Sequence, residues 1–397
     1  MKRSTFVTIV VIALSLAVGL CSAQVFNGQR INGFTVEIPQ SSIPHIGRMH
    51  TNYFIARPDA PNPAAPPPGA ETPGSLACVY KFVKGPKGCP IATSTNVPTG
   101  GWGAIAIVDA GDYPTAQSDL DTFSTQFGIP KADFQVVYAD GHKPPVYGDW
   151  EVEEALDIEW AHAMAPQAKL FLVESRQVNT DPTWLAVKVA GNLVAQNGGG
   201  VVSMSWGDPE VANERNWDKF FKSPSVVYFA AAGDSGIGVD IYPGASPNIV
   251  SVGGTLFVRN GNGDFETEVY ASDGGGADLS PYEPRPSYQN VIQNIVGNHR
   301  GYPDIASNFC CAAIYLQGWG SVGGTSWGTP TMAGTVNAAA HKKQSSRDEL
   351  KLIYGEYAND KNFYNSMFFD IISGSSDCMK GWDLCAGVGS PRTYKGK

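Results

Sequence analysis

Apolar residues in this chain of 397 residues gather in short uninterrupted runs, without the alternation of a half-exposed strand. Runs of this length predict strands that are buried on both faces, at 105–108, 170–173, 201–204 and 226–230. Stretches of helical length separate them, at 115–127, 150–166, 184–196 and 211–221. The alternation predicts parallel pairing with right-handed crossovers, and therefore an α/β fold with a doubly wound, mostly parallel sheet flanked by helices.

One serine stands where a hydrolase would place its nucleophile. Residues 323–330 end an irregular Gly-rich stretch, and residues 331–340, which follow, predict a buried helix. A hydroxyl at such a junction is open to substrate, and it lies near backbone N–H groups and the positive end of the helix. Ser326 is therefore the candidate nucleophile.

The proton acceptor for this serine is predicted to be an acid. His142 is followed by Lys143 and two prolines, which favour extended backbone, so it does not begin a helix as a subtilisin histidine would. On the predicted helix 150–166, Glu153 and Asp157 lie on one face beside bulky apolar residues. Two carboxylates at this spacing repel each other, and shared protonation in a partly dry cleft would relieve the repulsion. Alone, the pattern also fits a solvated acidic face.

A third acid follows the apolar strand at 226–230, in the tight turn Gly233-Asp234-Ser235-Gly236. The carboxyl ends of strands are where open α/β sheets build their sites, although an aspartate in a turn is common without any such role.

Together these residues resemble the sedolisin family of serine-carboxyl peptidases, whose fold is like that of subtilisin and whose glutamate replaces the histidine. The resemblance extends from about Trp102 to Pro391 and includes further segments in the same order along the chain, at 104–110, 118–123, 127–130, 201–207, 242–247 and 252–255. It implies a single catalytic domain over residues 99–397.

The resemblance also implies a role for each acid. Ser326 would be the nucleophile, Glu153 the general base, Asp157 the acid that orients Glu153 through a shared hydrogen bond, and Asp234 the acid of the oxyanion hole. Only a protonated Asp234 can donate a hydrogen bond to the developing oxyanion. We therefore expect an endopeptidase that cleaves proteins or peptides with a bell-shaped pH profile at about pH 3 to 5.

One structural calcium ion is a further expectation from the resemblance. Asp370 and Asp383 would supply carboxylate oxygens, and Ile371, Met379 and Gly381 would supply backbone carbonyls, which are the hard ligands that Ca²⁺ prefers. A Gly-rich acidic turn without a metal is the alternative.

The N-terminal part predicts export. A basic start, an apolar run and small residues at 21–23 indicate a signal peptide over residues 1–23, so the protein is expected to be secreted, extracellular or periplasmic, without membrane insertion after cleavage. Residues 24–98 form a short N-terminal region with a Pro-rich linker, which does not fit the long folded propeptide usual in the family. We expect a monomer.

Cysteines and charge agree with an exported protein. Six of the seven cysteines follow the signal peptide; proximity favours the pairs Cys78–Cys89 and Cys378–Cys385, and leaves Cys310 and Cys311 either bridged or reduced. A net charge of −9 argues against nucleic-acid binding. Charged residues are only 16%, which limits repulsion at acid pH.

Other functions stay open from the sequence alone. A subtilisin-type peptidase would use Asp109, His142 and Ser326 near neutral pH. A catalytically inactive binding protein on the same scaffold would hydrolyse nothing. An esterase of the α/β-hydrolase kind lacks support, because Ser326 has no Gly-x-Ser-x-Gly motif and only His341 follows it.

Overall fold

The computed structural model describes residues 27–239, 241–272 and 275–395. At its centre is an eight-stranded sheet with the order β13-β12-β10-β8-β5-β7-β6, in which β16 also pairs with β12. Only the β12–β13 pair is antiparallel. The strands are β5 (Ala104–Ala110), β6 (Phe134–Tyr138), β7 (Lys169–Ser175), β8 (Gly200–Met204), β10 (Val226–Ala231), β12 (Val250–Arg259), β13 (Phe265–Tyr270) and β16 (Ile305–Asn308).

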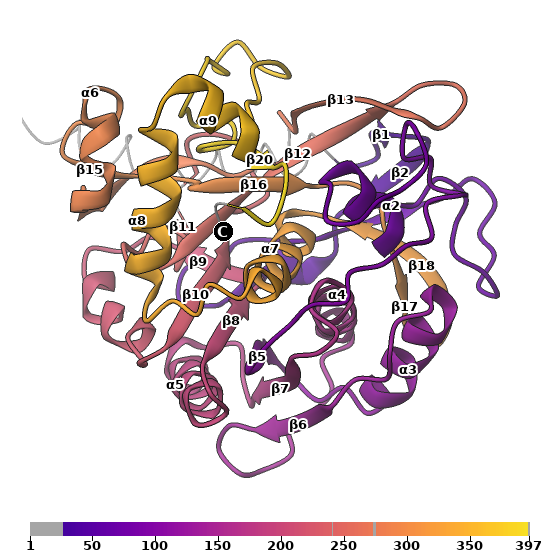
Figure 1. The fold of residues 1–397 in the computed structure, drawn as a ribbon. Helices are drawn as coiled ribbons and strands as arrows, with labels where there is room; N and C mark the ends of the chain where they lie inside the picture. The colour runs from indigo at the N-terminus through magenta and orange to yellow at the C-terminus, as the bar shows by residue number, and fades with distance from the viewer. Residues whose placement is uncertain (1–26, 240, 273–274, 396–397) are drawn as a thin grey trace, which may run out of the picture.

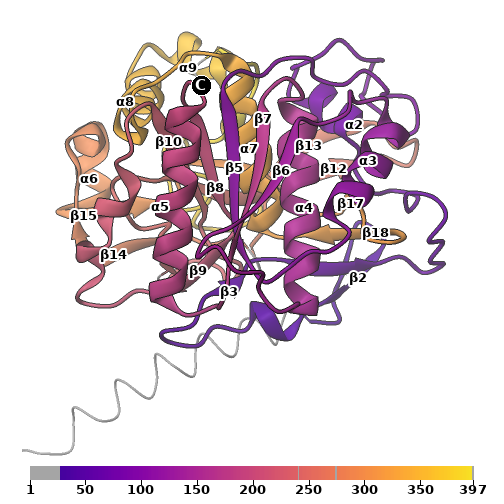
Figure 2. The same cartoon turned by 90° about the horizontal axis from the view of Figure 1, so that it is seen from below.

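Helices cover both faces of this sheet (Figures 1 and 2). Ile105 and Ile107 of β5 pack with apolar residues of α3, α4, α7 and α8, whereas Ala106 and Val108 pack with those of α5. Successive side chains of one strand therefore enter opposite cores, which explains why the strands read as unbroken apolar runs. The helices are α3 (Ala116–Phe127), α4 (Gly148–Met164), α5 (Thr180–Gln196), α7 (Thr325–Ala339) and α8 (Ser346–Tyr357).

The predicted α/β architecture with a mostly parallel sheet is confirmed, and two local predictions are wrong. Residues 211–221 form two 3-10 turns, η2 (Glu214–Asn216) and η3 (Asp218–Phe221), because Trp217, Phe220 and Phe221 pack around the ring of Trp184 instead of along one helix face. The Gly-rich stretch before Ser326 is not irregular, because residues 319–323 form the strand β18 and α7 already begins at Thr325.

The N-terminal region is part of the same body. Strands from residues 30–57 complete two small sheets, of order β1-β2-β4-β18-β17 and β11-β9-β3. The Pro-rich residues 58–68 contain neither helix nor strand. The strands are β1 (Arg30–Ile31), β2 (Phe34–Glu37), β3 (His50–Thr51), β4 (Phe54–Arg57), β9 (Trp206–Pro209), β11 (Ile241–Tyr242), β17 (Ala312–Tyr315) and β18 (Trp319–Gly323).

Short elements complete the part of the chain that the structure describes. Two further pairs of strands are β14 (Asp278–Pro284) with β15 (His299–Tyr302), and β19 (Phe368–Phe369) with β20 (Ser390–Pro391). The remaining helices are α2 (Pro73–Val79), α6 (Gln293–Val296) and α9 (Lys361–Met367), with the 3-10 turns η1 (Gln40–Ser42) and η4 (Ser287–Ile292).

Three disulfide bonds join Cys78 to Cys89, Cys310 to Cys311, and Cys378 to Cys385. The two pairings that proximity favoured are thus present, and the adjacent pair is bridged. In the described ranges, none of the helices is both long and apolar enough to cross a bilayer. The predicted signal peptide at 1–23 lies outside the described residues.

Candidate active site

The candidate nucleophile lies in the first turn of α7, directly after β18. Between them Gly324 has φ of 122°, a backbone conformation that favours glycine. A Cβ atom at this position would lie 2.1 Å from the carbonyl oxygen of Asn52 and 2.5 Å from Oδ2 of Asp234. Glycine is therefore required both by the turn and by the two oxygens beside it.

Close packing of α4 against α7 brings the acids to the serine. A Cβ atom on Gly334 of α7 would lie 2.7 Å from Cβ of Met164 and 2.8 Å from the carbonyl oxygen of Ala161 on α4, so glycine allows this approach. The rings of Trp160 and Trp327 meet at 4.9 Å, edge to face. Trp327 is fully buried there and belongs to the core.

Glu153 faces the nucleophile from α4 and is completely buried. Burial raises the pKa of its carboxyl well above the ordinary value, Asp157 and Asp109 raise it further, and the neighbouring Ser326 hydroxyl lowers it. Neither carboxyl oxygen has a hydrogen-bond partner among the described residues. The Ser326 hydroxyl instead donates to the carbonyl oxygen of Ser205 at 2.9 Å. A carboxyl group is thus held beside the serine without a hydrogen bond to any described residue.

Asp157 lies one helical turn further along α4 and is also completely buried. The hydroxyl of Ser205 donates to it, at 2.8 Å from each carboxyl oxygen. The expected hydrogen bond between Asp157 and Glu153 is not formed in the described structure. Burial, followed by the charge of Asp109, raises the pKa of Asp157, while the Ser205 hydroxyl lowers it. Asp157 thus contacts Ser205, and its charge raises the pKa of Glu153.

Asp109 is a third acid of this cluster, which sequence reasoning placed only in the subtilisin-type alternative. It lies near the carboxyl end of β5, fully buried, and burial raises its pKa to about 8. Both of its carboxyl oxygens lack a hydrogen-bond partner in the described part of the chain. A lone aspartate at the end of an apolar strand was the signal in the sequence that could have assigned it to the acid cluster.

Asp234 follows β10 at the same edge of the sheet, because β5, β8 and β10 are parallel neighbours. Its Oδ1 accepts hydrogen bonds from the backbone N–H of Thr325 at 2.8 Å and from the Thr325 hydroxyl at 2.7 Å. Its Oδ2 is buried without a partner among the described residues, next to Gly324. Burial raises the pKa of Asp234 well above its ordinary value, partly offset by the bonds from Thr325.

The histidine of the subtilisin-type alternative does not reach this site. The side chain of His142 is 73% exposed, and its ring contacts Asp140 of its own turn. His341 is exposed beyond the end of α7. Glu153 and Asp157 of α4 and Asp109 of β5 therefore form the acid cluster next to Ser326. The structure brings neither His142 nor His341 to this cluster.

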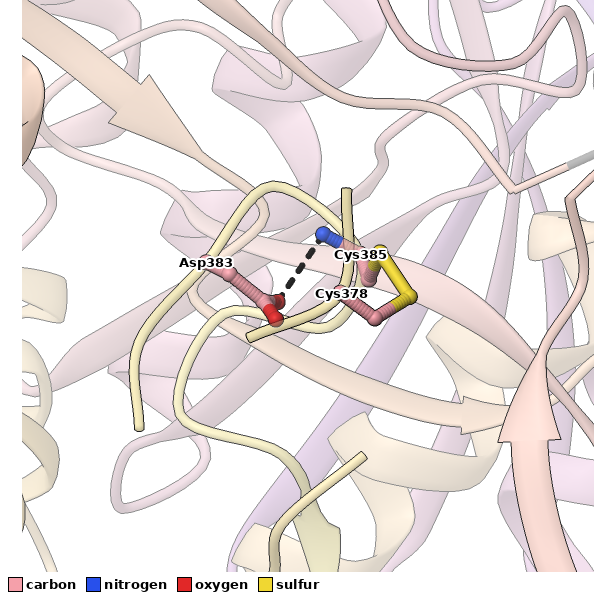
Figure 3. A group of neighbouring side chains, drawn as sticks. All are labelled: Cys378, Asp383 and Cys385. Carbon is pink, nitrogen blue, oxygen red and sulfur yellow. Dashed lines mark hydrogen bonds between the residues drawn. A yellow bond between two sulfur atoms is a disulfide. The ribbon is translucent and has the colours of Figure 1, made fainter. Parts of the chain in front are cut away.

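The predicted calcium ligands lie on one C-terminal loop. Asp370 accepts hydrogen bonds from the N–H of Gly381, and Asp383 accepts them from Met379, Cys385 and Ala386. Burial raises the pKa of Asp383 to about 6, and the charge of Asp370 adds to this effect. Figure 3 shows Asp383 beside Cys378 and Cys385, whose sulfur atoms are bonded to each other and therefore offer no thiolate to a metal.

A mostly parallel sheet between two layers of helices, with a serine at the start of a buried helix, defines a subtilisin-like α/β protein. The solved structure of Pseudomonas sedolisin, a serine-carboxyl proteinase complexed with two molecules of pseudo-iodotyrostatin, matches the fold with a TM-score of 0.67 at 20% identity, covering 81% of this chain and 95% of that one.

Sequence comparison finds similar proteins, and a sedolisin is among them. Physarolisin from Physarum polycephalum is 25% identical over 329 residues, which cover 61% of this chain and 55% of that protein. Sedolisin from Pseudomonas sp. (strain 101) is 23% identical over 353 residues, covering 76% of this chain and 58% of that protein. No family model matches the chain. Sequence and fold together support the sedolisin family for this chain, which spans little more than half the length of these two relatives.

Proposed function

We propose that this chain is a secreted serine-carboxyl endopeptidase that hydrolyses peptide bonds of proteins or peptides through an acyl-enzyme at Ser326. The observation that supports it most is a buried carboxyl, Glu153, which lies beside the buried hydroxyl of Ser326 and makes no hydrogen bond among the described residues. A buried carboxyl with unused hydrogen-bonding capacity costs stability, so its retention next to a hydroxyl favours a catalytic role.

Glu153 acts as the general base. As the oxygen of Ser326 bonds to the carbonyl carbon of the substrate, the hydroxyl proton passes to Glu153, which must therefore be ionised. Burial and the nearby acids raise the pKa of Glu153, and a carboxylate with a raised pKa is a stronger base. Asp157 and Asp109 lie in the same cluster, so the three carboxyl groups titrate together. The pH dependence of activity at low pH therefore reports the cluster and not Glu153 alone.

Asp234 stabilises the oxyanion in its neutral form. Its unpartnered Oδ2 lies beside Gly324, which precedes α7, and the N–H of Ser326 lies in the first turn of that helix, so a protonated Asp234 and this amide would donate to the same oxygen. Burial favours the neutral carboxyl. Activity is lost at low pH when Glu153 is protonated and at higher pH when Asp234 ionises, which gives a bell-shaped profile.

A calcium ion is proposed for the C-terminal loop. Asp370 and Asp383, with the backbone carbonyls of Ile371, Met379 and Gly381, would supply hard oxygen ligands, and the repulsion between the two carboxylates favours a cation between them. The ion would hold the loop and stabilise the fold. Secretion is supported by the three disulfide bonds and by the signal-like N-terminus. We propose a monomer that does not bind nucleic acid.

The function is tested by hydrolysis of casein and of a fluorogenic peptide from pH 2 to 8. The full chain should be active with a bell-shaped profile, and Ser326→Ala should remove the activity while leaving the melting temperature close to that of the wild type. Equal hydrolysis by Ser326→Ala would show that another group or a contaminant is responsible. If the folded wild-type protein hydrolyses neither substrate at any pH, the result would favour the alternative of an inactive binding protein.

A further inference from the structure

The acid cluster next to the nucleophile continues from Asp109 to the neighbouring strand. β5 and β7 are parallel and lie side by side (Figure 2), and their register pairs Asp109 with Glu174 near the carboxyl ends of both strands. Residues that are paired in this way extend their side chains from the same face of the sheet. Ile107 and Leu172, two residues earlier on each strand, lie in one core with Ile158 of α4. Asp109 and Glu174 therefore lie next to each other on the face that α4 covers.

α4 brings a third acid to this pair. Glu154 lies one helical turn before Ile158, on the same face of α4, and is completely buried. Neither of its carboxyl oxygens has a hydrogen-bond partner among the described residues. Burial raises the pKa of Glu154 well above its ordinary value, and the charges of Asp109 and Glu174 raise it further. Glu154 is therefore the acid of this group that keeps its proton to the highest pH.

Asp109 and Glu174 differ in the groups that stabilise their charge. Both side chains are buried, which raises the pKa of each carboxyl to about 8, so the pair loses its first proton as a unit. The N–H of Tyr113 donates to Oε1 of Glu174 at 3.3 Å, and this bond and the charge of Lys143 lower the pKa of Glu174. Both oxygens of Asp109 lack a partner in the described part of the chain. The first charge of the pair therefore falls on Glu174.

Lys143 supplies its positive charge from the surface. Its side chain is 60% exposed, and its Nζ lies 3.0 Å from the carboxylate of Asp112, whose side chain is 3% exposed. Tyr138 of β6 is paired in register with Glu174, and its hydroxyl donates to Asp112 at 3.3 Å. The titratable groups around Asp109, Glu154 and Glu174 are Glu151, Glu153 and Asp157 of α4, Asp112 and Tyr113 after β5, Asp119 of α3, Tyr138 of β6 and Lys143 after β6. Among these described residues, Lys143 carries the only positive charge.

Asp109 connects the pair to the general base. After burial and the charge of Asp157, the charge of Asp109 raises the pKa of Glu153. A carboxylate at Asp109 therefore opposes the ionised form of Glu153 that the reaction requires. Asp109 and Glu174 repel each other when both are charged, so a charge on Glu174 opposes the ionisation of Asp109.

We propose that Glu174 and Lys143 are positioning residues for the general base: the ionised Glu174, held by Lys143, keeps Asp109 protonated, and the neutral Asp109 leaves Glu153 free to ionise. Charge then alternates along this row of acids, on Glu174 and on Glu153, with a neutral Asp109 facing both. The proposal rests on the proposed function, because it concerns the base of that reaction.

Glu174→Gln and Lys143→Met test the row through the low-pH limb of the kcat profile, measured with one peptide. Without the charge on Glu174, or without the cation that holds it, Asp109 ionises more readily and repels the ionised Glu153. The limb should therefore move to higher pH by about one unit in Glu174→Gln, equivalent to about tenfold lower kcat below the optimum, and by less in Lys143→Met. Lys143→Arg keeps the charge and should restore the parent profile. Because Lys143 is exposed, its variants cover the case in which Glu174→Gln fails to fold.

Two controls separate this effect from the loss of any buried acid. Glu159 of α4 is also completely buried, but its carboxyl accepts the N–H of Tyr315 at 3.1 Å, so Glu159→Gln should leave the limb in place. In the Asp109→Asn background this position cannot ionise, so Glu174→Gln and Lys143→Met should no longer move the limb. A limb that stays in place or moves to lower pH in both single variants, or a shift that persists with Asp109→Asn, would overturn the proposal and leave the peptidase standing.

The titration of Asp109 gives a readout that does not need catalysis. In the full chain with ¹³C-labelled aspartate, the Asp109 signal is assigned by its absence in Asp109→Asn. Its carboxyl should titrate at lower pH in Glu174→Gln and in Lys143→Met than in the wild type. This change without hydrolysis by any variant would support the link between Glu174 and Asp109 and refute the proposed function. An unchanged titration of Asp109 in both variants would refute the link.

Discussion

Replacement of Asp234 by asparagine tests whether protonation of this side chain sets the pH dependence of activity, because asparagine has nearly the same shape and does not titrate. Oδ1 of Asp234 accepts two hydrogen bonds from Thr325, whereas Oδ2 has no partner among the described residues. Because the N–H of Thr325 can only donate, an asparagine must keep its oxygen toward Thr325. Its NH₂ group then takes the place of Oδ2 beside Gly324. Asp234→Asn therefore supplies a donor that needs no protonation.

The two substitutions should differ in size and in pH dependence. Asp234→Ala removes the donor and should lower kcat by about 10²–10³-fold, equivalent to about 2.7–4 kcal/mol. Asp234→Asn should stay within about tenfold of the parent at its optimum, because one neutral donor replaces another. In the parent, activity falls as pH rises through the pKa of Asp234, which burial raises. In Asp234→Asn this fall should move to higher pH.

The assay is kcat and kcat/KM for one peptide from pH 2 to 8. The parent, Asp234→Asn and Asp234→Ala are compared at equal folded concentration. If the two variants lose activity equally and keep the parent's fall at higher pH, Asp234 is not the donor, and the assignment of the oxyanion hole is wrong.

Three other predictions concern the base, the metal and the stability. Glu153→Gln should lower kcat by about 10²–10⁴-fold at the pH optimum of the parent, with an unchanged melting temperature, whereas equal activity would exclude Glu153 as the base. EDTA should lower the melting temperature of the wild type but not that of Asp370→Asn/Asp383→Asn, and an equal effect on both would exclude this calcium site. Burial raises the pKa of Glu268 from 4.5 to about 7. Its contribution to the free energy of unfolding is therefore complete below pH 4.5 and is lost as the pH rises through 7, a difference of about 3 kcal/mol. Denaturant unfolding from pH 4 to 8 should show this loss in the wild type and less of it in Glu268→Gln.

Local pattern was sufficient for the parts of the site that lie on regular elements. The apolar run of β10 placed Asp234 at the end of a buried strand, and the spacing of Glu153 and Asp157 placed both on one face of α4. The region at 211–221 could not be predicted in this way, because its aromatic residues follow the ring of Trp184 and not the period of a helix. Likewise, Asp109 joined the acid cluster only when the parallel order of β5 and β8 brought strand ends together.

Apolar runs and helical spacing predicted four central strands, β5, β7, β8 and β10, and the helices α3, α4 and α5, because strands buried on both faces have unbroken apolar runs and helices repeat their apolar positions with a helical period. Only the tertiary structure decided what lies on Ser326. Asn52 is 274 residues away in sequence, and it is held by backbone hydrogen bonds to Ser205 and Ser326. Backbone pairing uses groups that every residue except proline carries, so it leaves almost no trace in side-chain pattern. The register of β3 on β9 exists only once the chain has folded.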